Sequence, residues 1–383
     1  HVGEVELEAP VGGPGLLAEA AKLFEQRLDH ERPLWRVDLV PMIGGSAGVV
    51  MRIHHCLADG ITSQRFARAL FWDDVPDPPP TGPDDWSPGP EPSALDVARG
   101  SVVKRIGDVP GAVAGAFQGA RDPGRWAEGA REVAKFPATV ARELLPIGGD
   151  SVLDRRIGPR REIAAAWLDL DELKGIAHLA TTRLGGHVTL NDVLLASVAG
   201  GLRSWLEGQG GGSRGALRAQ VPVSLHGRDD GAGDLGNRDS YLNVDLRLDI
   251  ADPFERIRLI NVETTKRKES GDAQELFDFF HAISRFRPLY RGVTRISSGP
   301  RDFAVSISNV PGPAEPVYVN GARAAGFLSI AEPADRHALR VAAVSYVGSL
   351  AVGLACDPEA LPKIGELAEA IESASADLAL ALA

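Results

Sequence analysis

Residues 54–60 read His54-His55-Cys56-Leu57-Ala58-Asp59-Gly60, and they follow the apolar stretch 47–53. That stretch predicts a strand, so the run places a histidine where a buried strand opens into a loop, with a carboxylate four residues later. Neighbouring strand side chains point to opposite faces, so His54 and His55 are not expected to share one cavity. If His55 faces a cleft, its imidazole suits proton abstraction from a weak nucleophile near neutral pH. A metal site is not expected, because the histidines diverge and no third ligand is indicated.

Length and composition limit the classes of protein to consider. The chain has 383 residues, enough for two modest domains or one large α/β unit, and its 44% hydrophobic share allows an ordinary globular core. A formal net charge of −11 argues against nucleic acid as the main partner, because phosphate binding requires a basic surface. The chain begins with His1 rather than methionine, which is typical of a fragment.

The cysteines and the hydropathy pattern indicate the kind of cellular compartment in which the protein is expected. Only Cys56 and Cys356 occur, far apart in the sequence, which favours a reducing environment and provides no metal or disulfide framework. No segment resembles a signal peptide, and no apolar run approaches the roughly 20 residues needed to span a bilayer. The protein is therefore expected to be soluble or to lie on a membrane surface.

The first part of the chain alternates helices and strands. Periodicity predicts a helix at 16–28, strands at 33–40 and 48–53 joined by a turn at 44–46, and a helix at 61–71. Proline crowds residues 76–93, which predicts a linker, and residues 94–145 predict broken helices that cross over between two halves. The apolar side of these helices is expected to pack on its own domain rather than on a membrane.

The second half repeats the alternation. Strands are predicted at 164–170, 217–224, 241–248 and 304–308, followed by a hairpin of 339–346 and 350–356. Helices are predicted at 171–177, 191–206 with Thr189 as the cap, 253–268, 274–290 and 357–371. The pattern indicates an α/β fold with mixed sheets, organised as an N-terminal part at 1–77, a Pro-rich linker and helical crossover at 78–150, and a C-terminal part at 151–383.

Several short blocks occur in an order that resembles one known family. They are Pro33-Leu34-Trp35, the 54–60 run, Ile157-Gly158-Pro159-Arg160-Arg161, Asn191-Asp192-Val193-Leu194-Leu195-Ala196, Val221-Pro222-Val223-Ser224, Gly236-Asn237, Asn309-Val310-Pro311-Gly312-Pro313 and Ser345-Tyr346-Val347-Gly348. Over essentially its whole length the chain resembles the bacterial wax ester synthase/diacylglycerol acyltransferase family, a branch of the CoA-dependent acyltransferase superfamily. The resemblance implies two chloramphenicol-acetyltransferase-like halves with mixed sheets and a tunnel between them. It also implies that the N-terminal half is truncated here, because family members carry further sequence ahead of this starting point.

The resemblance implies a mechanism centred on His55. This residue would act as general base and deprotonate the hydroxyl of a fatty alcohol or diacylglycerol, which then attacks the thioester of a long-chain acyl-CoA. CoA leaves readily as a thiolate. The product would be a triacylglycerol or a wax ester, and no metal or cofactor beyond the co-substrate acyl-CoA is expected. The pattern Gly-x-Ser-x-Gly occurs at 44–48 and 211–215, but neither copy is predicted to lie between a strand and a following helix, as a nucleophile elbow requires, which argues against a hydrolase triad.

Other residues of the blocks have weaker functional interpretations. His54 is expected to pack on the opposite strand face, Asp59 to orient the loop or cap the next helix, and Gly60 to adopt a backbone angle closed to other residues. Asn191 either caps its helix or helps to hold the acyl carbonyl or active-site water. Asn309, with the Pro-Gly-Pro turn after it, either supports the active site at the tunnel mouth or belongs to a rigid structural turn, and the turn is favoured.

The basic cluster Arg155, Arg156, Arg160 and Arg161 could bind CoA phosphates or an anionic membrane, although runs of charge are more often solvated surface. Since the acyl acceptors dissolve in membranes, the protein is expected to be cytoplasmic and peripherally attached to the inner face of the cell membrane or to lipid inclusions.

Two alternatives stay open at this point. Peptide-synthetase condensation domains, which form amide bonds, share the His-His-x-x-x-Asp-Gly run. A non-catalytic lipid-binding or scaffold protein is the other, given the short N-terminal part. No motif indicates which alcohol would be preferred.

Overall fold

The computed structural model describes residues 1–73, 143, 151–210, 216–224, 239–284, 293–295, 299 and 302–382. The chain divides into two compact units, one formed by His1–Asp74 with Glu143–Ala383 and the other by Val75–Arg142. The first of these units contains every described element. The predicted linker and crossover over 78–150 lies outside the described residues except for Glu143.

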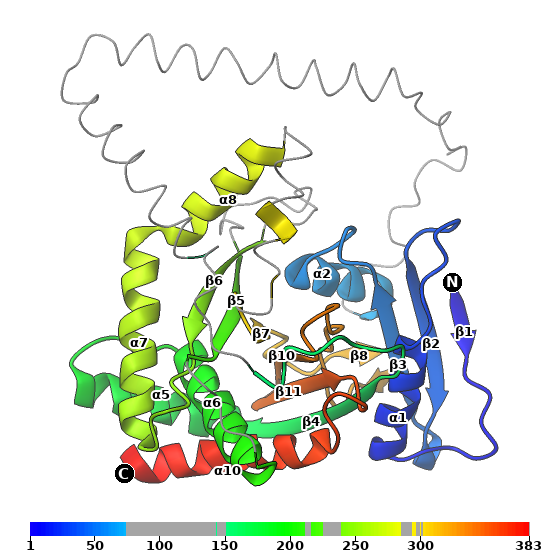
Figure 1. Cartoon of the computed structure of the whole chain (residues 1–383). Helices are drawn as coiled ribbons and strands as arrows, with labels where there is room; N and C mark the ends of the chain where they lie inside the picture. Colours follow the sequence, from blue (N-terminus) through cyan, green and yellow to red (C-terminus); the bar gives the residue numbers. More distant parts are fainter. Residues whose placement is uncertain are drawn as a thin grey trace. The chain divides into compact units, whose positions relative to one another are not determined.

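The N-terminal part is built on a small sheet (Figure 1). In the described residues its strand order is β1 (Val2–Glu4), β2 (Trp35–Pro41) and β3 (Ala47–Ile53), with β1 parallel and β3 antiparallel to β2. Helix α1 (Gly13–Phe24) precedes β2, and helix α2 (Gly60–Phe71) follows β3. The predictions of β2, β3 and α2 are confirmed. Helix α1 begins and ends earlier than predicted, since Pro14 lies in its first turn.

A buried ion pair holds α1 to this sheet. Arg52 of β3 donates to Asp38 of β2 at 3.0 Å, and both side chains are buried. The same guanidinium donates to the carbonyl oxygens of Leu23 and Gln26, at the end of α1. Arg52 thereby adds side-chain donors to carbonyl groups at and just after the end of the helix, where intrahelical donors run out.

The C-terminal part contains a mixed sheet of the order β4-β11-β10-β7-β5-β6 within the described residues. The strands are β4 (Glu162–Asp169), β5 (Arg218–Ser224), β6 (Asp239–Asp245), β7 (Val305–Val310), β10 (Leu339–Tyr346) and β11 (Ser349–Cys356). Strands β10, β7 and β5 run parallel, and the outer neighbours pair antiparallel. The prediction of mixed sheets is confirmed.

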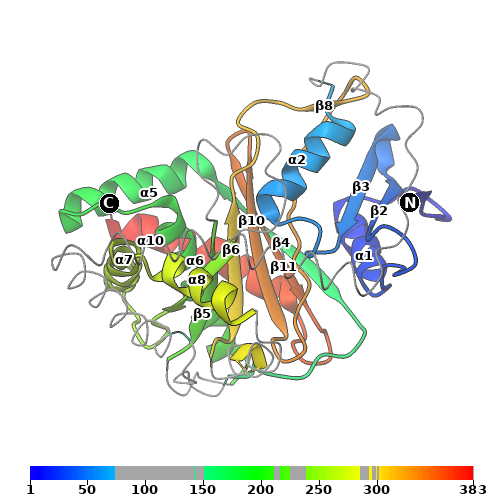
Figure 2. The same ribbon diagram turned by 90° about the horizontal axis from the view of Figure 1, so that it is seen from above.

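Helices cover one face of this sheet. They are α5 (Leu170–Leu184), α6 (Leu190–Gly208), α7 (Pro253–Ser270) and α10 (Ile364–Leu382), while α8 (Asp272–Ser284) follows α7. Figure 2 shows α5, α6 and α10 on one side of the sheet and α1 and α2 on the other. The main hydrophobic core lies between the sheet and the helical side and includes Leu194, Leu195, Ile307, Val341 and Ile371.

The C-terminal helix differs from its prediction. It was expected to begin at 357, but residues 357–363 form a turn and α10 begins at Ile364. Asp357 accepts hydrogen bonds from the backbone N–H groups of Gly158 at 2.5 Å and Glu359 at 2.9 Å. The carboxylate therefore stabilises the turn and tethers the 157–161 block.

Helix α6 begins after Thr189, the predicted cap, and the cap is a capping box. The Thr189 hydroxyl accepts from the Asp192 N–H at 3.2 Å, and the Asp192 carboxylate accepts from the Thr189 N–H at 2.8 Å. The fully buried Asp192 carboxylate also accepts from Thr264 Oγ1 at 2.6 Å and Asn261 Nδ2 at 3.1 Å, both on α7. Asp192 is thus the polar contact that joins α6 to α7.

The contacts between the N-terminal part and the C-terminal part include three sets around α1 and the end of α2. A small apolar cluster contains Ala20 and Ala21 of α1 with Ile163 of β4 and Ala355 of β11. The Arg161 N–H donates to Glu25 Oε1 at 3.0 Å. The third set, around the end of α2, is described next.

The end of α2 is fixed to a short hairpin of β8 (Tyr318–Val319) and β9 (Ala322–Arg323). The Asp73 carboxylate accepts from the N–H groups of Asn320 at 2.7 Å and Gly321 at 2.8 Å, and the Asp73 N–H donates to the Tyr318 carbonyl at 2.9 Å. Asn320 and Gly321 both have positive φ, which directs their N–H groups into the turn. The hairpin thus holds α2 by its last turn.

Candidate active site

The two histidines lie in a loop rather than at the end of the strand. Strand β3 ends at Ile53, and His54 opens a turn in which the Leu57 N–H donates to the His54 carbonyl at 2.9 Å. The alternation expected for strand side chains therefore does not apply to His54 and His55. Both residues are exposed, so the predicted packing of His54 against a strand face is not what the structure shows. The His54 ring accepts a hydrogen bond from the Cys56 N–H at 3.1 Å, and its role is to close the turn.

The imidazole of His55 is oriented by its own loop. Its Nδ1 lies 3.1 Å from the carbonyl oxygen of Ala58. A carbonyl oxygen can only accept, so this contact places a proton on Nδ1 and leaves the lone pair on Nε2. This is the tautomer that a general base acting through Nε2 requires.

Asp59 caps helix α2, one of its two predicted roles. Its carboxylate accepts from the Thr62 N–H at 2.8 Å, and the residue is 1% exposed. The negative charge lies at the positive end of the helix, which stabilises both. Asp59 thus fixes the junction between the histidine loop and α2.

Gly60 has a different role from the one predicted. Its φ is not among the positive values, so no unusual backbone angle calls for glycine. A Cβ at this position would lie 2.7 Å from Cγ2 of Val310, at the end of β7. Glycine is present because the backbone packs directly against Val310 of the Asn309–Pro313 block.

That block is itself held by the Ser345–Gly348 block. The Gly312 N–H donates to Ser345 Oγ at 3.0 Å, and the Val347 N–H donates to the Pro313 carbonyl at 3.3 Å. Three of the blocks noted in the sequence therefore meet at one place, although they are far apart along the chain.

The two asparagines occupy different positions from each other. Asn191 is partly exposed in the first turn of α6, and the capping contacts there are made by Thr189 and Asp192 rather than by Asn191. Asn309 pairs with Ala343 of β10, and Ala343 belongs to the core on the helical face. Alternation therefore places Asn309 on the sheet face opposite to Val310 and the histidine loop.

The predicted basic cluster is partly used in ion pairs. The Arg161 guanidinium donates to Glu332 at 2.9 Å and to the Gly158 carbonyl at 2.7 Å, and the Arg160 guanidinium lies 3.6 Å from Glu25. Arg155 and Arg156 are exposed. These contacts favour a structural role for Arg161 over phosphate binding.

Two other arginines were not singled out by the sequence. Nη1 of Arg65, on α2, and Nε of Arg340, on β10, are buried without a hydrogen-bond partner in the structure. For Arg340, the only sign in the sequence of an unusual role was its positive charge within the otherwise apolar stretch 338–344.

A buried ionic cluster lies around Arg218, the first residue of β5. The guanidinium groups of Arg218 and Arg267 surround Glu143, and Arg218 also lies 3.8 Å from Asp302. Burial raises the pKa of Asp302 to about 7, although Arg218 opposes the shift. Burial also raises the pKa of Glu143. The cluster is distant in sequence from the histidine loop and has no assigned part in the chemistry.

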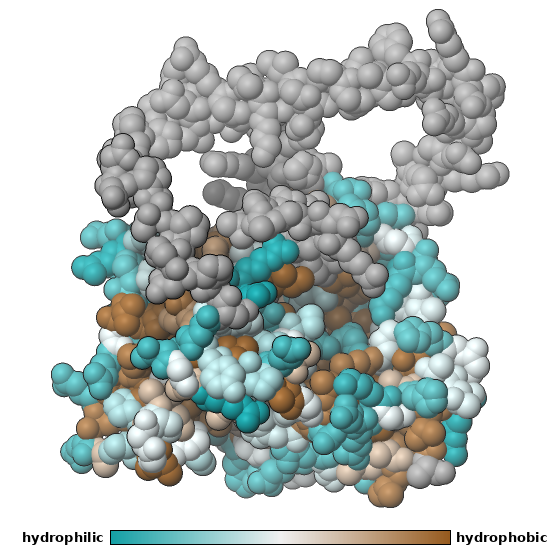
Figure 3. Space-filling view, turned by 180° about the vertical axis from the view of Figure 1, so that it is seen from behind, coloured by the Kyte–Doolittle hydropathy of each residue, from teal (hydrophilic) through white to brown (hydrophobic). Residues whose placement is uncertain are grey.

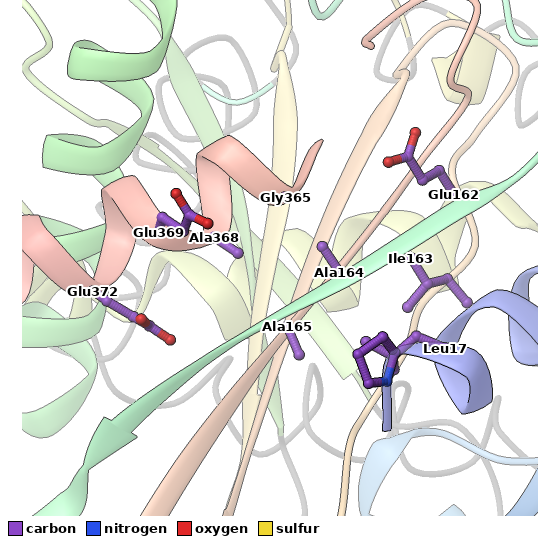
Figure 4. A pocket seen from close by; sticks show the side chains of 10 residues that line it. Leu17, Glu162, Ile163, Ala164, Ala165, Gly365, Ala368, Glu369 and Glu372 are labelled. Carbon is purple, nitrogen blue, oxygen red and sulfur yellow. The ribbon is translucent and has the colours of Figure 1, made fainter. Parts of the chain in front are cut away.

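Figure 4 shows a pocket whose lining includes three glutamates and no residue of the histidine loop. This pocket of about 300 Å³ lies beside β4, between α1 and α10, and three glutamates line it: Glu162, Glu369 and Glu372. One of them, Glu372, accepts from the Trp167 N–H at 2.8 Å. Among the residues described, no group of histidine, cysteine and acidic side chains has the arrangement of a metal site.

Sequence comparisons identify the family. The wax ester synthase/diacylglycerol acyltransferase catalytic domain matches residues 1–194, and the WS/DGAT C-terminal domain matches residues 235–379. The Mycobacterium tuberculosis protein named "Probable diacyglycerol O-acyltransferase tgs2" is 28% identical over 99% of this chain and 80% of its own length. The Acinetobacter baylyi "O-acyltransferase WSD" is 26% identical over 97% of this chain and 79% of its own length.

Solved structures agree on the fold. The wax ester synthase/diacylglycerol acyltransferase of Marinobacter aquaeolei VT8 superposes with a TM-score of 0.62 at 22% identity, covering 100% of this chain and 79% of that one. A starter condensation domain of rhizomide synthetase gives a TM-score of 0.51 at 12% identity, covering 98% of this chain and 76% of that one. The two likenesses establish a shared fold, and the family matches over both parts of the chain distinguish the two groups. This chain belongs to the wax ester synthase/diacylglycerol acyltransferase family and is an acyltransferase.

Proposed function

We propose that the protein transfers a long-chain acyl group from acyl-CoA to the hydroxyl of diacylglycerol or a fatty alcohol, with His55 as general base. The family match and the names of the relatives support the reaction class. The contact between His55 Nδ1 and the Ala58 carbonyl carries the assignment of the base, because it leaves the lone pair on Nε2. The reaction requires no metal or cofactor beyond the co-substrate.

The chemistry proceeds in one displacement. Nε2 of His55 removes the proton of the acceptor hydroxyl as its oxygen attacks the thioester carbonyl. The carbon–sulfur bond then breaks, the CoA thiolate leaves, and the proton on His55 passes to the thiolate. Asp59 acts on this step only through the loop, by fixing the start of α2.

Attachment to a membrane or a lipid inclusion belongs to the same proposal. No helix in the described part of the chain is long and apolar enough to cross a bilayer. On the N-terminal sheet, Leu39 and Val49 pair across β2 and β3 and are 37% and 47% exposed, and Val2 lies on the same face at 69% exposed. These exposed apolar side chains, which share the face with exposed Glu4, support contact with lipid. Seen from behind the view of Figure 1, polar and apolar residues are interspersed over the part of the surface not drawn in grey (Figure 3).

An acyl-transfer assay tests the function and the base together. The full chain is incubated with palmitoyl-CoA and either hexadecanol, a diacylglycerol or an alkylamine, and thiol release is followed alongside neutral lipid on thin-layer plates. We expect release that depends on an alcohol and falls by about 10²–10⁴-fold in His55→Ala. His54→Ala is the matched control, because that ring contacts the same loop but is not the proposed base. Amide formation with the amine would support a condensation enzyme instead, and undiminished activity in His55→Ala would exclude His55 as the base.

Sedimentation with vesicles tests the attachment separately. Binding to vesicles of neutral and anionic lipid should weaken in Leu39→Asp and Val49→Asp if the sheet face contacts lipid. Binding that is unchanged in both variants would place the lipid contact elsewhere.

A further inference from the structure

Arg340 lies on the sheet face that the histidine loop contacts. Its neighbours Leu339 and Val341 in β10 belong to the helical core, so the Arg340 side chain leaves the opposite face. Val310 of β7 lies on that same opposite face, because Val305 and Ile307 are core residues and alternation reverses at each position. Figure 2 shows α1 and α2 on this side of the sheet.

The surroundings of Arg340 in the sheet are uncharged. Its direct partners across the ladder are Ser306 of β7 and Ala355 of β11, and Ser306 is 2% exposed. The Nε–H group is enclosed and has no hydrogen-bond acceptor, and no ion pair of Arg340 occurs in the described structure. Burial alone lowers the pKa of Arg340, with no carboxylate opposing the shift.

Other buried arginines of the chain have at least one acceptor for the guanidinium, although single N–H groups of Arg52 and Arg218 also lack a hydrogen-bond acceptor. Arg52 is paired with Asp38, Arg267 with Glu143 and Glu263, and Arg256 donates to the Ile250 carbonyl. A guanidinium that is largely removed from water and has no partner destabilises the fold, because its charge has lost hydration and gained no anion. Such a residue is explained if an anion binds to it during function.

We infer that Arg340 binds the diphosphate of the acyl-CoA donor, on the sheet face where the histidine loop packs. The inference rests on the proposed function. Ser306, opposite Arg340, is four residues before Val310, so the two positions lie about 13 Å apart along β7. The pantetheine arm separates the thioester from the diphosphate, so a single donor molecule can reach His55 and Arg340 together. A planar guanidinium suits a phosphate because it donates two parallel hydrogen bonds.

Ligand binding without turnover provides the first test. Isothermal titration measures the Kd of CoA, pantetheine and palmitate with the full chain and with Arg340→Met, which keeps the apolar stem and removes the charge. We expect the Kd of CoA to rise about tenfold or more in this variant, and that of pantetheine, which has no phosphate, to stay unchanged. Arg258→Met is the control, because Arg258 lies on α7 with its side chain 40% exposed and pairs with Glu255. A weakened affinity for palmitate alone would assign Arg340 to a fatty-acid carboxylate and overturn the proposal.

Thermal unfolding separates anion binding from a structural role. Without ligand, Arg340→Met should unfold at the same temperature as the parent chain or higher, because an unpaired buried charge is removed. With saturating CoA, the parent chain should gain stability and the variant should gain less. A variant that is destabilised without ligand and gains as much from CoA as the parent would show that Arg340 serves the fold.

Steady-state kinetics distinguishes the proposed acyl transfer from the proposed anion site at Arg340. The KM for palmitoyl-CoA should rise in Arg340→Met with kcat nearly unchanged, the KM for palmitoyl-pantetheine should not, and Arg340→Lys should recover part of the loss. If the chain transfers no acyl group but CoA binding depends on Arg340, the proposed function fails and the anion site stands. If transfer depends on His55 while CoA binding ignores Arg340, the anion site alone fails.

Discussion

Gly60 and Val310 are in direct contact, so closely that a Cβ on residue 60 would lie 2.7 Å from Val310 Cγ2. The first residue of α2 is thereby seated on the end of β7, and the histidine loop before it is held between the two halves of the fold. A Val side chain is short and stiff at χ1, so it cannot move aside without a change in the backbone.

We therefore expect Gly60→Ala to displace the loop and lower kcat by about tenfold or more, since small misplacements of a base are costly. The double variant Gly60→Ala/Val310→Ala should recover part of the loss, because it restores the space. Gly13→Ala is the matched control, as Gly13 begins α1 and a Cβ there would meet no neighbouring atom. Steady-state kinetics on the parent, Gly60→Ala, Val310→Ala and the double variant measures the coupling, and additive effects of the two substitutions would contradict the contact.

Asp73 should stabilise the attachment of α2 to the β8–β9 hairpin. Replacing it with alanine removes two charge-assisted hydrogen bonds, to the Asn320 and Gly321 N–H groups, at a cost of about 1–2 kcal/mol in unfolding free energy. Asp171→Ala, which removes an exposed ion pair with Lys174, should cost less than about 0.5 kcal/mol. Urea unfolding compares the free energies of unfolding of the two variants. Equal losses would mean that the contact with the hairpin stabilises the fold no more than an exposed ion pair does.

Substitutions of Asp192 and of its neighbour Asn191 should have different effects on stability. Asp192→Ala removes a buried carboxylate that accepts from Thr189, Asn261 and Thr264, and we expect a loss of about 3–5 kcal/mol in stability. Asn191→Ala should leave stability nearly unchanged, because Asn191 is not the cap. If Asn191 helps to hold the acyl carbonyl, its variant loses kcat while its urea midpoint stays the same. An unchanged kcat would assign no catalytic part to Asn191.

The Asp302 carboxyl should make stability depend on pH. Its pKa is raised to about 7 from an ordinary value near 3.8, so the folded state holds a proton that the unfolded state has released. Stability from this group is present below the unfolded pKa and is lost as pH rises toward about 7. Between pH 4 and pH 7 the free energy of unfolding of Asp302→Asn should therefore rise relative to that of the parent, because only the parent loses this contribution. An identical pH dependence in the two proteins would contradict the raised pKa.

Local patterns in the sequence were enough for much of the fold. The apolar runs 339–346 and 350–356 on either side of a turn predicted the β10–β11 hairpin, and Thr189 as the cap predicted the start of α6. Both depend on residues close in sequence, whose geometry is set by the backbone period and by helix ends. Strand β1 could not be predicted in this way, because its three residues are held by pairing with β2.

The candidate site was predictable in its residues and less so in its contacts. Asp59 as a cap is a local matter and was among the two expected roles. The reason for Gly60 lies in Val310, and the partner of Arg161 is Glu332, each far along the chain, so no local pattern could show them. The positions of His54 and His55 depended on where β3 ends, and element boundaries are what periodicity defines least well.

The exposed thiol of Cys56, beside His55, offers a way to observe the loop directly. The only other cysteine, Cys356, is buried, and burial raises the pKa of its thiol to about 12, so it stays unreactive near neutral pH. A maleimide fluorophore would therefore label the unaltered sequence at a single known position. Its emission would report the arrival of donor or acceptor at the loop in real time, with no cysteine removed or introduced.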